Sequence, residues 1–348
     1  MWRLALVLLF HVPLILLGGA RAEAATDPPC SDPWDFCEGQ ERAIEAAVFG
    51  LEPLRSGHQP DVVQVFYVDD YSRPRAAVEM VRSQNGGARM TIIMPISPPE
   101  WPDNMGMSGF RRVVRTANVS PAQAELMFSR AENIFHAVEE VPETPNTVCI
   151  HPRAARLTVS LGGRTASRTR NTCYPDTLSE LIYDIGDLAI SLRPECAALD
   201  RETAGWTMYR LNACGRLSGD LRIAAEVTNI AKRWARPVKD EVSLHQMTER
   251  FDDAITLFWP EHGSRSGIEA TAAFLAQQAA GKRLDVGIFS ADAESSVRAV
   301  VRGGIDYRCT EGACSGRADF EQVWHRDGPG PWRIQTWTVE PFVIDTYE

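Results

Sequence analysis

The stretch from Val297 to Glu340 constrains the fold of this 348-residue chain most, because its apolar and polar residues alternate with a period of two. Two turn-forming segments divide the alternation into three runs. The second of them, residues 327–331, reads Asp-Gly-Pro-Gly-Pro. Successive side chains of an extended strand point to opposite faces, so this pattern is typical of strands with one buried face. The short turns predict an antiparallel three-stranded meander.

The register of the first two strands of the meander can be derived from their side chains. The predicted cross-strand pairs are Cys309 with Cys314, Asp306 with Arg317, Arg302 with Glu321, Val300 with Val323 and Gly303 with Phe320. Two of these pairs join opposite charges, one forms a disulfide across the turn, and one lays an aromatic ring over a strand glycine. A slip of one residue would lose these matches and turn every side chain to the other face. The two glycines at 303–304 predict a bulge or a sharp bend.

Residues 1–22 have the pattern of a signal peptide. Arg3 gives a positive start, residues 4–17 are apolar apart from His11 and Pro13, and residues 20–22 read Ala-Arg-Ala, a small-residue cleavage site. About 14 apolar positions are too few to span a membrane. We therefore expect an exported protein without a membrane span, an uncleaved anchor being the alternative. Lysine occurs only three times against abundant arginine and alanine, which suggests a bacterial source and hence a periplasmic or secreted protein.

Export decides how the eight cysteines are interpreted, because disulfides persist in oxidising compartments. Sequence alone does not choose among the pairings. Pairing of neighbours is preferred, since each bridge then stays within one predicted unit. The preferred pairs are Cys30 with Cys37, Cys149 with Cys173, Cys196 with Cys214 and Cys309 with Cys314. A zinc site is the alternative, which the lack of a C-x-x-C motif and of paired histidines near the cysteines does not favour. No metal and no cofactor is predicted.

The charge balance excludes a nucleic-acid partner. The chain has 36 basic and 46 acidic residues and a formal net charge of −10, so no basic surplus exists to neutralise phosphates. Several arginines nevertheless cluster in the sequence, namely Arg111, Arg112, Arg115, Arg153, Arg156, Arg164, Arg168 and Arg170. An anionic ligand or envelope surface is one interpretation of this cluster. The favoured one is that these arginines lie on the solvent-facing side of a strand.

The part of the chain before residue 215 predicts hairpins with helices between them. Strands are expected at 62–68, 76–82, 88–93, 110–117, 155–161 and 164–172, and helices at 120–140 and 176–194. Without a βαβ rhythm this order indicates an α+β domain. We predict a disulfide-bearing α+β domain of unassigned role over 23–215, followed by helices at 221–236, 244–257 and 270–278.

Three stretches after residue 221 carry a resemblance. They are Ile255-Thr256-Leu257-Phe258-Trp259, residues 266–275 with the sequence SGIEATAAFL, and residues 332–337 with the sequence WRIQTW. With the order of the elements around them, they resemble the SnoaL-like, nuclear transport factor two-like superfamily over residues 221–345. The resemblance implies a curved antiparallel sheet wrapped by helices into a cone, often dimeric through the outer sheet face. Its members include isomerases, dehydratases and non-catalytic binding domains, so the fold does not settle the function.

Candidate site residues follow from the register and the resemblance together. Ketosteroid-isomerase-like members place a carboxylate on the short strand after the second helix, and here the nearest groups are Glu261 and His262, so the expected Asp is missing. The predicted inner face shows Ile334 among an apolar lining, which suits a small-ligand pocket. The ligand-binding candidates are Trp259, Tyr307, Gln322, Trp324 and Thr336. A filled core with satisfied polar atoms is the commoner arrangement.

The function predicted from these features is non-catalytic. The sequence has no G-x-S-x-G, H-E-x-x-H, P-loop or G-x-G-x-x-G motif. We expect the cone to bind a small apolar ligand or a protein partner. The alternative is an isomerase- or hydratase-type enzyme with Glu261 or His262 as base and Tyr307 as proton donor or oxyanion stabiliser, which requires the base to point into the cone. A third hypothesis is a purely structural cone that closes a homodimer through Val300, Val323 and Trp337.

Overall fold

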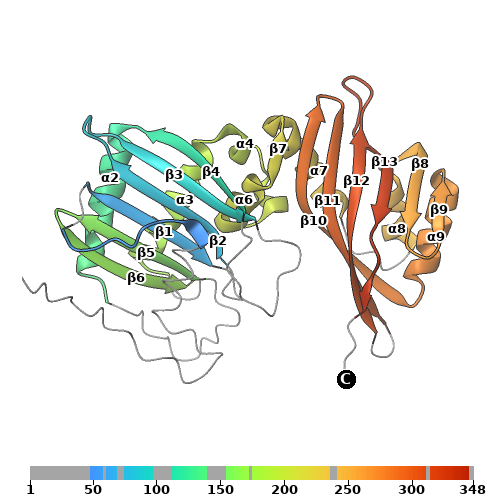
Figure 1. Cartoon of the computed structure of the whole chain (residues 1–348), viewed down its shortest axis with the longest axis horizontal. Coiled ribbons are helices and arrows are strands. Elements are labelled where there is room, and N and C mark those ends of the chain that lie inside the picture. The colour runs from blue at the N-terminus through green and yellow to red at the C-terminus, as the bar shows by residue number, and fades with distance from the viewer. Residues whose placement is uncertain are drawn as a thin grey trace, which may run out of the picture. The chain divides into compact units, whose positions relative to one another are not determined.

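The computed structural model describes residues 48–57, 60–68, 74–96, 111–138, 154–171, 175–235, 241–310 and 314–344, all of which fall within one compact unit, Ile44–Glu348. These residues form two sheets with helices packed against them, so the predicted α+β class is confirmed (Figure 1). None of the described helices combines the length and the apolar character that a membrane crossing needs.

Some predictions fall on residues outside the described ranges. They are the signal peptide at 1–22 and the disulfide pairs Cys30–Cys37 and Cys149–Cys173. These stay predictions, as does the division of the chain into domains at 23–215 and 221–345.

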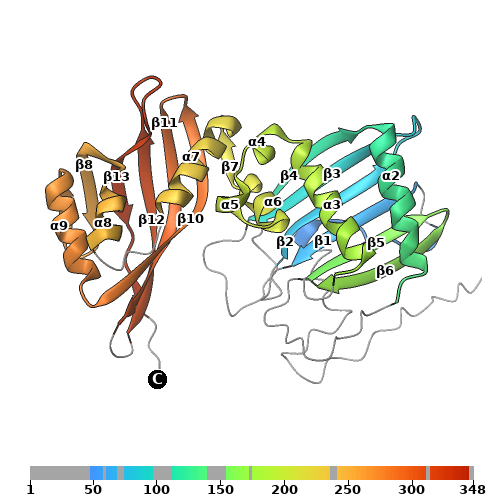
Figure 2. The ribbon, with the colours of Figure 1, turned by 180° about the vertical axis from the view of Figure 1, so that it is seen from behind.

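The first sheet has six antiparallel strands in the order β4-β3-β2-β1-β5-β6. Their bounds are β1 Val62–Val68, β2 Pro74–Arg82, β3 Ala88–Ile96, β4 Arg111–Val119, β5 Ala154–Leu161 and β6 Arg164–Asn171. One face is covered by α2 (Pro121–Ala131) and α3 (Thr177–Ser191), as Figure 2 shows, and the 3-10 helix η1 (Glu132–Phe135) contacts β5 and β6. The strands, their hairpins and the two helices were predicted, although α2 passes into η1 and ends earlier than expected.

The starts of both helices follow from their capping residues. The Ser120 side chain accepts the backbone N–H of Gln123, and Pro121 takes the first helical position, where a missing N–H does no harm. Helix α3 begins with a capping box in which the side chains of Asp176 and Ser179 each accept the other's backbone N–H.

The arginines of β6 serve the fold rather than an anionic ligand. Arg170 is buried and donates to the Asp176 carboxylate at 2.8 Å and to the Val138 carbonyl at 2.8 Å. The Arg164 guanidinium lies 4.2 Å from the centre of the Phe135 ring. The expectation of a solvent-facing arginine is therefore wrong for the buried Arg156 and Arg170. In Arg170, carbonyl and carboxylate oxygens inside the fold satisfy the guanidinium group.

Three short helices lead from the first sheet to the second. They are α4 (Pro194–Ala197), α5 (Arg201–Ala204) and α6 (Thr207–Gly215), followed by β7 (Leu217–Gly219). The predicted Cys196–Cys214 disulfide is confirmed and joins α4 to α6. The Asn212 side chain on α6 donates to the Arg75 carbonyl at 3.0 Å, which ties α6 to β2.

The second sheet has eight strands, of which seven lie in the order β7-β10-β11-β12-β13-β8-β9 and the last, β14, pairs with β12. Their bounds are β8 Phe251–Trp259, β9 Gly263–Ser266, β10 Lys282–Ser295, β11 Arg298–Cys309, β12 Ser315–His325, β13 Arg333–Val339 and β14 Val343–Ile344. Helices α7 (Leu221–Trp234), α8 (Glu241–Thr248) and α9 (Ile268–Ala279) accompany this sheet, and α7 crosses in front of β10 and β11 in Figure 2.

The predicted register between β11 and β12 is confirmed at every position. All four non-cysteine pairs derived from the sequence are partners in the sheet. Cys309 and Cys314 form the disulfide across the turn. Arg302 and Glu321 form an ion pair of 2.9 Å, and Arg317 lies 4.0 Å from Asp306.

The predicted bulge is present but lies on the neighbouring strand. The irregularity falls in β10 between Ile288 and Ser290, opposite Gly303 of β11. A Cβ atom at Gly303 would lie 2.1 Å from the Gly287 carbonyl oxygen and 2.4 Å from a Phe320 ring carbon. Only glycine therefore permits this close approach of the backbone and the ring.

Three sequence expectations for this region are wrong, and one strand was missed. Residues 251–257 form strand β8 and not the end of a helix. The missed strand is β10. A bulge between Ile334 and Thr336 changes the phase of β13, so that Trp337 pairs with Gln322 and Thr336 pairs with Val323. Thr336 therefore leaves the inner face predicted for it. Trp337 is buried inside and cannot belong to an outer dimer surface.

Candidate functional site

The inner face of the second sheet is filled over most of its length. We call this part the interior; it is formed by the side chains of Trp234, Phe251, Phe320, Trp324 and Trp337. The Trp234 ring packs edge-on against Trp324 and Trp337, with ring centres 6.0 and 5.4 Å apart. All five side chains are buried, so the interior is a packed core.

Two predicted ligand-binding residues belong to this interior. Gln322 and Trp324 have no exposed surface, and the Trp324 indole N–H donates to the Gln322 side-chain oxygen at 2.9 Å. That bond fixes the orientation of the amide. The amide nitrogen of Gln322 and the indole N–H of Trp337 then find no acceptor among the described residues. The interior is thus filled, but its polar atoms are not all satisfied.

A pocket opens beyond the interior, at the end of the sheet where β8 turns into β9. We call it the mouth pocket. Its volume is about 220 Å³. Its main walls are Trp259, Glu261, His262, Lys282, Tyr307 and Phe342.

Aromatic rings in contact build one side of the mouth pocket. Trp259 packs on Phe342 with ring centres 5.5 Å apart, and Phe342 packs on Tyr307 at 5.4 Å. Phe274 of α9 supports the wall from behind, since its ring contacts both Trp259 and His262 at 5.5 Å. These rings come from β8, α9, β11 and the segment after β13, so the pocket exists only in the folded chain.

Glu261 enters the pocket from a turn with an uncommon backbone. It is the only described residue other than glycine with a positive φ, which is 65°. The N–H of His262 donates to the Trp259 carbonyl across this turn, and Pro260 occupies its second position. A proline followed by a residue of positive φ is the pattern of a type II turn, where glycine is usual at the third position. A glutamate at this position is strained by the order of 1 kcal/mol.

The charged groups of the mouth pocket have no charged partners among the residues that the structure describes. The Lys282 ammonium lies 4.9 Å from the centre of the Tyr307 ring, a cation–π contact. Among the described residues, neither Lys282 nor Glu261 forms an ion pair. A cation and a carboxylate therefore face one small aromatic pocket, each available to a bound molecule.

The structure separates the candidate residues into two groups. Trp259, Glu261, His262 and Tyr307 meet at the mouth pocket, whereas Gln322 and Trp324 lie in the interior. Glu261 and His262 are exposed at the rim and do not point into the interior. The catalytic alternative with Glu261 or His262 as base stays a prediction, and any such base would act at the rim of the mouth pocket.

Of the six residues of the main walls, sequence reasoning missed two, Lys282 and Phe342. The strand that carries Lys282 was not predicted, and Phe342 follows the predicted meander. The rarity of lysine in this chain was a usable signal for Lys282.

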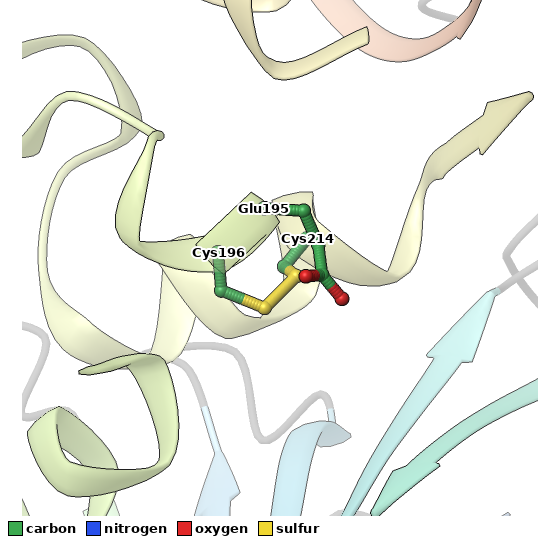
Figure 3. A group of neighbouring side chains, drawn as sticks. All are labelled: Glu195, Cys196 and Cys214. Atoms are coloured by element: carbon green, nitrogen blue, oxygen red, sulfur yellow. A yellow bond between two sulfur atoms is a disulfide. The ribbon is translucent and has the colours of Figure 1, made fainter. Parts of the chain in front are cut away.

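A second cluster lies near the first sheet. Glu195, Cys196 and Cys214 place their ligand atoms within 4.8 Å of one another, the one such group of potential metal ligands in the described residues (Figure 3). The two sulfurs are bonded to each other, and neither is a free thiolate. The Glu195 carboxylate accepts from Arg193 at 2.7 Å, with Arg115 at 3.7 Å. These partners leave no donor set for a cation.

The same cluster has a structural role, because its ion pairs and hydrogen bonds connect separate elements. Burial alone would raise the pKa of Glu195, but hydrogen bonds from its own backbone N–H and from Arg193 outweigh burial and hold that pKa below its ordinary value. Arg115 of β4 also donates to the Leu217 carbonyl at 3.4 Å. The cluster thus joins β4 to the helices that follow the first sheet.

Comparison with solved structures finds NTF2-like and ketosteroid isomerase-like folds. A ketosteroid isomerase-like protein from Erwinia carotovora atroseptica SCRI1043 is 13% identical, with 28% of this chain and 82% of that chain covered and a TM-score of 0.25. An NTF-2-like protein of unknown function from Shewanella oneidensis MR-1 is 16% identical, with coverages of 28% and 84% and a TM-score of 0.25. A hypothetical protein with a ketosteroid isomerase-like fold from Catenulispora acidiphila DSM 44928, in complex with trimethylamine, is 14% identical, with coverages of 33% and 83% and a TM-score of 0.26.

The resemblance predicted from the sequence is thus found again among solved structures, over about 30% of the chain. No protein-family model matches the chain, and no curated protein matches it. At these identities and TM-scores the matches carry no ligand and no residue role to this chain.

Proposed function

We propose that the second sheet and its helices form a non-catalytic module that binds a small ligand in the mouth pocket. The observation that supports this proposal best is that side chains from separate parts of the chain line one cavity. The end of β8 and the turn after it provide Trp259, Glu261 and His262, while β10 provides Lys282, β11 provides Tyr307 and the segment after β13 provides Phe342. Ligand sites are concave and largely apolar, with a few polar groups that orient the ligand. The mouth pocket is concave and combines aromatic rings with polar and charged groups in about equal share, whereas the interior has no room.

The size of the pocket limits the ligand. A water molecule takes about 30 Å³ of liquid volume, so 220 Å³ corresponds to roughly seven waters. The pocket lies below the range of roughly 300–1,000 Å³ typical of drug-sized ligands. A compact molecule of about one ring with a short side chain is the expected occupant.

Two neighbouring glutamines on α9 provide a matched pair of variants for the test. Gln278 lines the mouth pocket and Gln277 does not. Gln278→Trp should fill the pocket, whereas Gln277→Trp places the same ring on the exposed side of the same helix. We would titrate the full chain with indole and with 2-phenylethanol and follow ligand-observed NMR.

The proposal predicts binding of at least one probe by the native chain and by Gln277→Trp, and loss of that binding in Gln278→Trp. Equal binding by both variants would contradict the proposal, because the ligand would then lie elsewhere. A circular dichroism melt of each variant shows whether it is folded.

A second candidate function is acid–base catalysis at the rim of the pocket. The strained backbone of Glu261 favours it, because strain of this kind concentrates at functional positions. Here Glu261 or His262 would remove a proton from a carbonyl compound, and Tyr307 would donate to the developing oxyanion. The test is hydrogen–deuterium exchange next to the carbonyl of cyclohexanone in heavy water, with Glu261→Gln as the variant. Exchange no faster than in buffer would exclude this function for simple ketones.

We also propose that the protein is exported and that it forms a homodimer. The two disulfides of the described residues are of the kind that persists in oxidising compartments. Intact-mass measurement of the protein secreted by an exporting host should show loss of residues 1–22 and no free thiol. Native mass spectrometry of the same sample should show a dimer, and a monomer would contradict dimer formation.

A further inference from the structure

We propose that the ligand of the mouth pocket is a small aromatic zwitterion, a molecule with one carboxylate and one ammonium group on a flat apolar body. This inference rests on the proposed function and adds the chemical class of the ligand. It follows from the two charged side chains of the pocket and from the aromatic wall that lines the same pocket.

The cationic side of the pocket is built by the start of β10. Lys282 follows Gly281, whose φ of 69° turns the chain into the strand. Thr310 donates its backbone N–H and its hydroxyl to the Gly281 carbonyl at 2.9 and 3.0 Å, which fixes this turn. The Lys282 side chain then lies over the face of the Tyr307 ring. Its ammonium group keeps hydrogen-bond donors for a ligand, since it forms no ion pair with a described residue.

The Tyr307 ring is itself held in place. A Cβ atom at Gly316, the cross-strand partner of Tyr307, would lie 2.4 Å from a carbon of that ring. The ring therefore lies close to the glycine, and Phe342 packs edge-on against it with ring centres 5.4 Å apart. The ammonium group of Lys282 thus has a rigid support, which lowers the entropy lost when it binds a carboxylate.

The anionic side is built by the turn between β8 and β9. Arg265, the nearest cation in sequence, donates to the carbonyls of His262 and Ser264 at 2.9 and 2.8 Å and lies over the Phe274 ring. It stabilises the turn and leaves the Glu261 carboxylate without an ion-pair partner in the described part of the chain. An ammonium group on the ligand would supply the missing charge.

The aromatic wall of the pocket decides the body of the ligand. Glu261 and Lys282 line one pocket but do not pair with each other, and Trp259 and Phe342 lie in the same wall. Aromatic walls favour a flat apolar body, which they contact by offset stacking or edge-on packing. A neutral ligand would leave both charges unused, and a simple anion would leave Glu261 to repel it.

Four compounds with the same phenylethyl body separate the contributions of the two charges. L-Phenylalanine carries both charges, 3-phenylpropanoate only the carboxylate, 2-phenylethylamine only the ammonium group, and 2-phenylethanol neither. Calorimetric titration of the full chain should give the highest affinity for phenylalanine. Each missing charge should lower the affinity roughly fivefold or more.

Charge-removing variants assign each charge to its side chain. Lys282→Gln should weaken the two carboxylate compounds and leave 2-phenylethylamine unchanged, and Lys282→Arg should restore the loss in part. Glu261→Gln should weaken the two ammonium compounds only. The matched controls are Arg283→Gln and Glu269→Gln, which remove the same charges next to the pocket without lining it.

The outcomes distinguish this inference from the proposed function. If 2-phenylethanol binds as tightly as phenylalanine and Gln278→Trp abolishes both, the pocket binds ligands but the zwitterion class is wrong. If 3-phenylpropanoate binds best and Glu261→Gln strengthens it, the ligand is an anion and the inference is overturned. If none of the four compounds binds, the proposed function fails with it.

Discussion

The interior and the mouth pocket lie on one face of one sheet, yet one is filled and the other is hollow. The interior receives Trp234 from α7, whose ring closes the space between Trp324 and Trp337. At the mouth, Gln278 of α9 is the one lining residue from a described helix, and the turn after Trp259 and the segment with Phe342 surround an open volume. A pocket in this fold is therefore a place where helix packing stops, and the sheet sequence alone does not locate it.

The largest expected effect is the loss of stability when a ring is removed from the interior, compared with the loss when a ring is removed from the mouth pocket. Trp324→Ala removes a fully buried ring and should lower the free energy of unfolding by about 3–5 kcal/mol. Tyr307→Ala removes a half-buried ring at the mouth and should cost roughly 1–2 kcal/mol. Urea unfolding followed by circular dichroism measures both. Equal losses would mean that the mouth is packed as tightly as the interior.

The next prediction concerns the bend that shapes the inner face. Gly303→Ala should destabilise the fold by about 1–3 kcal/mol, since the added Cβ meets the Gly287 carbonyl oxygen and the Phe320 ring. Gly287→Ala is the matched control. Its Cβ would make only an ordinary contact of 3.6 Å with Phe289, so it should cost less than about 1 kcal/mol. Reversed order in a thermal melt would show that the close approach at Gly303 is not present in solution.

The substitution at Glu261, unlike the previous ones, should not lower the stability of the fold. Glu261→Gly relieves the positive φ and should leave stability unchanged or raise it by up to about 1 kcal/mol, the relief being partly offset by the entropy of glycine in the unfolded chain. The same variant should weaken an ammonium-bearing ligand. Glu249→Gly, at an exposed turn without positive φ, should be destabilising in the same unfolding assay. A destabilised Glu261→Gly would contradict the account of strain.

The smallest effect concerns acid stability at the interior end of β8. The backbone N–H of Ala254 and the side chain of His325, 2.7 Å away, hold the pKa of Asp252 below its ordinary value. A carboxyl with a lowered pKa in the fold adds stability above its unfolded pKa, near 3.9, and loses it as the pH falls through the folded value.

Asp252→Asn should therefore cost about 1 kcal/mol or less at neutral pH, and the difference from the native chain should shrink as the pH falls below about 3.9. Urea midpoints at neutral and acid pH measure it. A difference that grows on acidification has the wrong sign for this account.

The register between β11 and β12 was predictable because its partners are chemically distinct. Arg302 opposite Glu321 and Cys309 opposite Cys314 are matches that a slip would destroy, and the structure has them. The phase of β13 was not predictable in this way. A bulge at one residue sends Trp337 inward and Thr336 outward, and no charge pair marks its position.

Strand β8 shows a second limit. Phe251, Ala254, Ile255 and Phe258 have helical spacing, but in the structure Phe251 and Ile255 are buried while Ala254 and Phe258 are exposed. The parallel pairing of β8 with β13 forms over a long sequence separation and overrides the local pattern. The candidate site was predictable for Trp259, Glu261, His262 and Tyr307, and not for Lys282 and Phe342, because their elements were not in the predicted fold.

The central claim is that the ligand lies at the mouth and not in the interior. The indole N–H signals of selectively labelled tryptophan, followed by NMR during titration with L-phenylalanine, test it most directly. The account predicts that the signal of Trp259 shifts and that those of Trp324 and Trp337 stay. Shifts of Trp337 with a static Trp259 would contradict it, and would assign the ligand to the unsatisfied N–H groups of the interior instead.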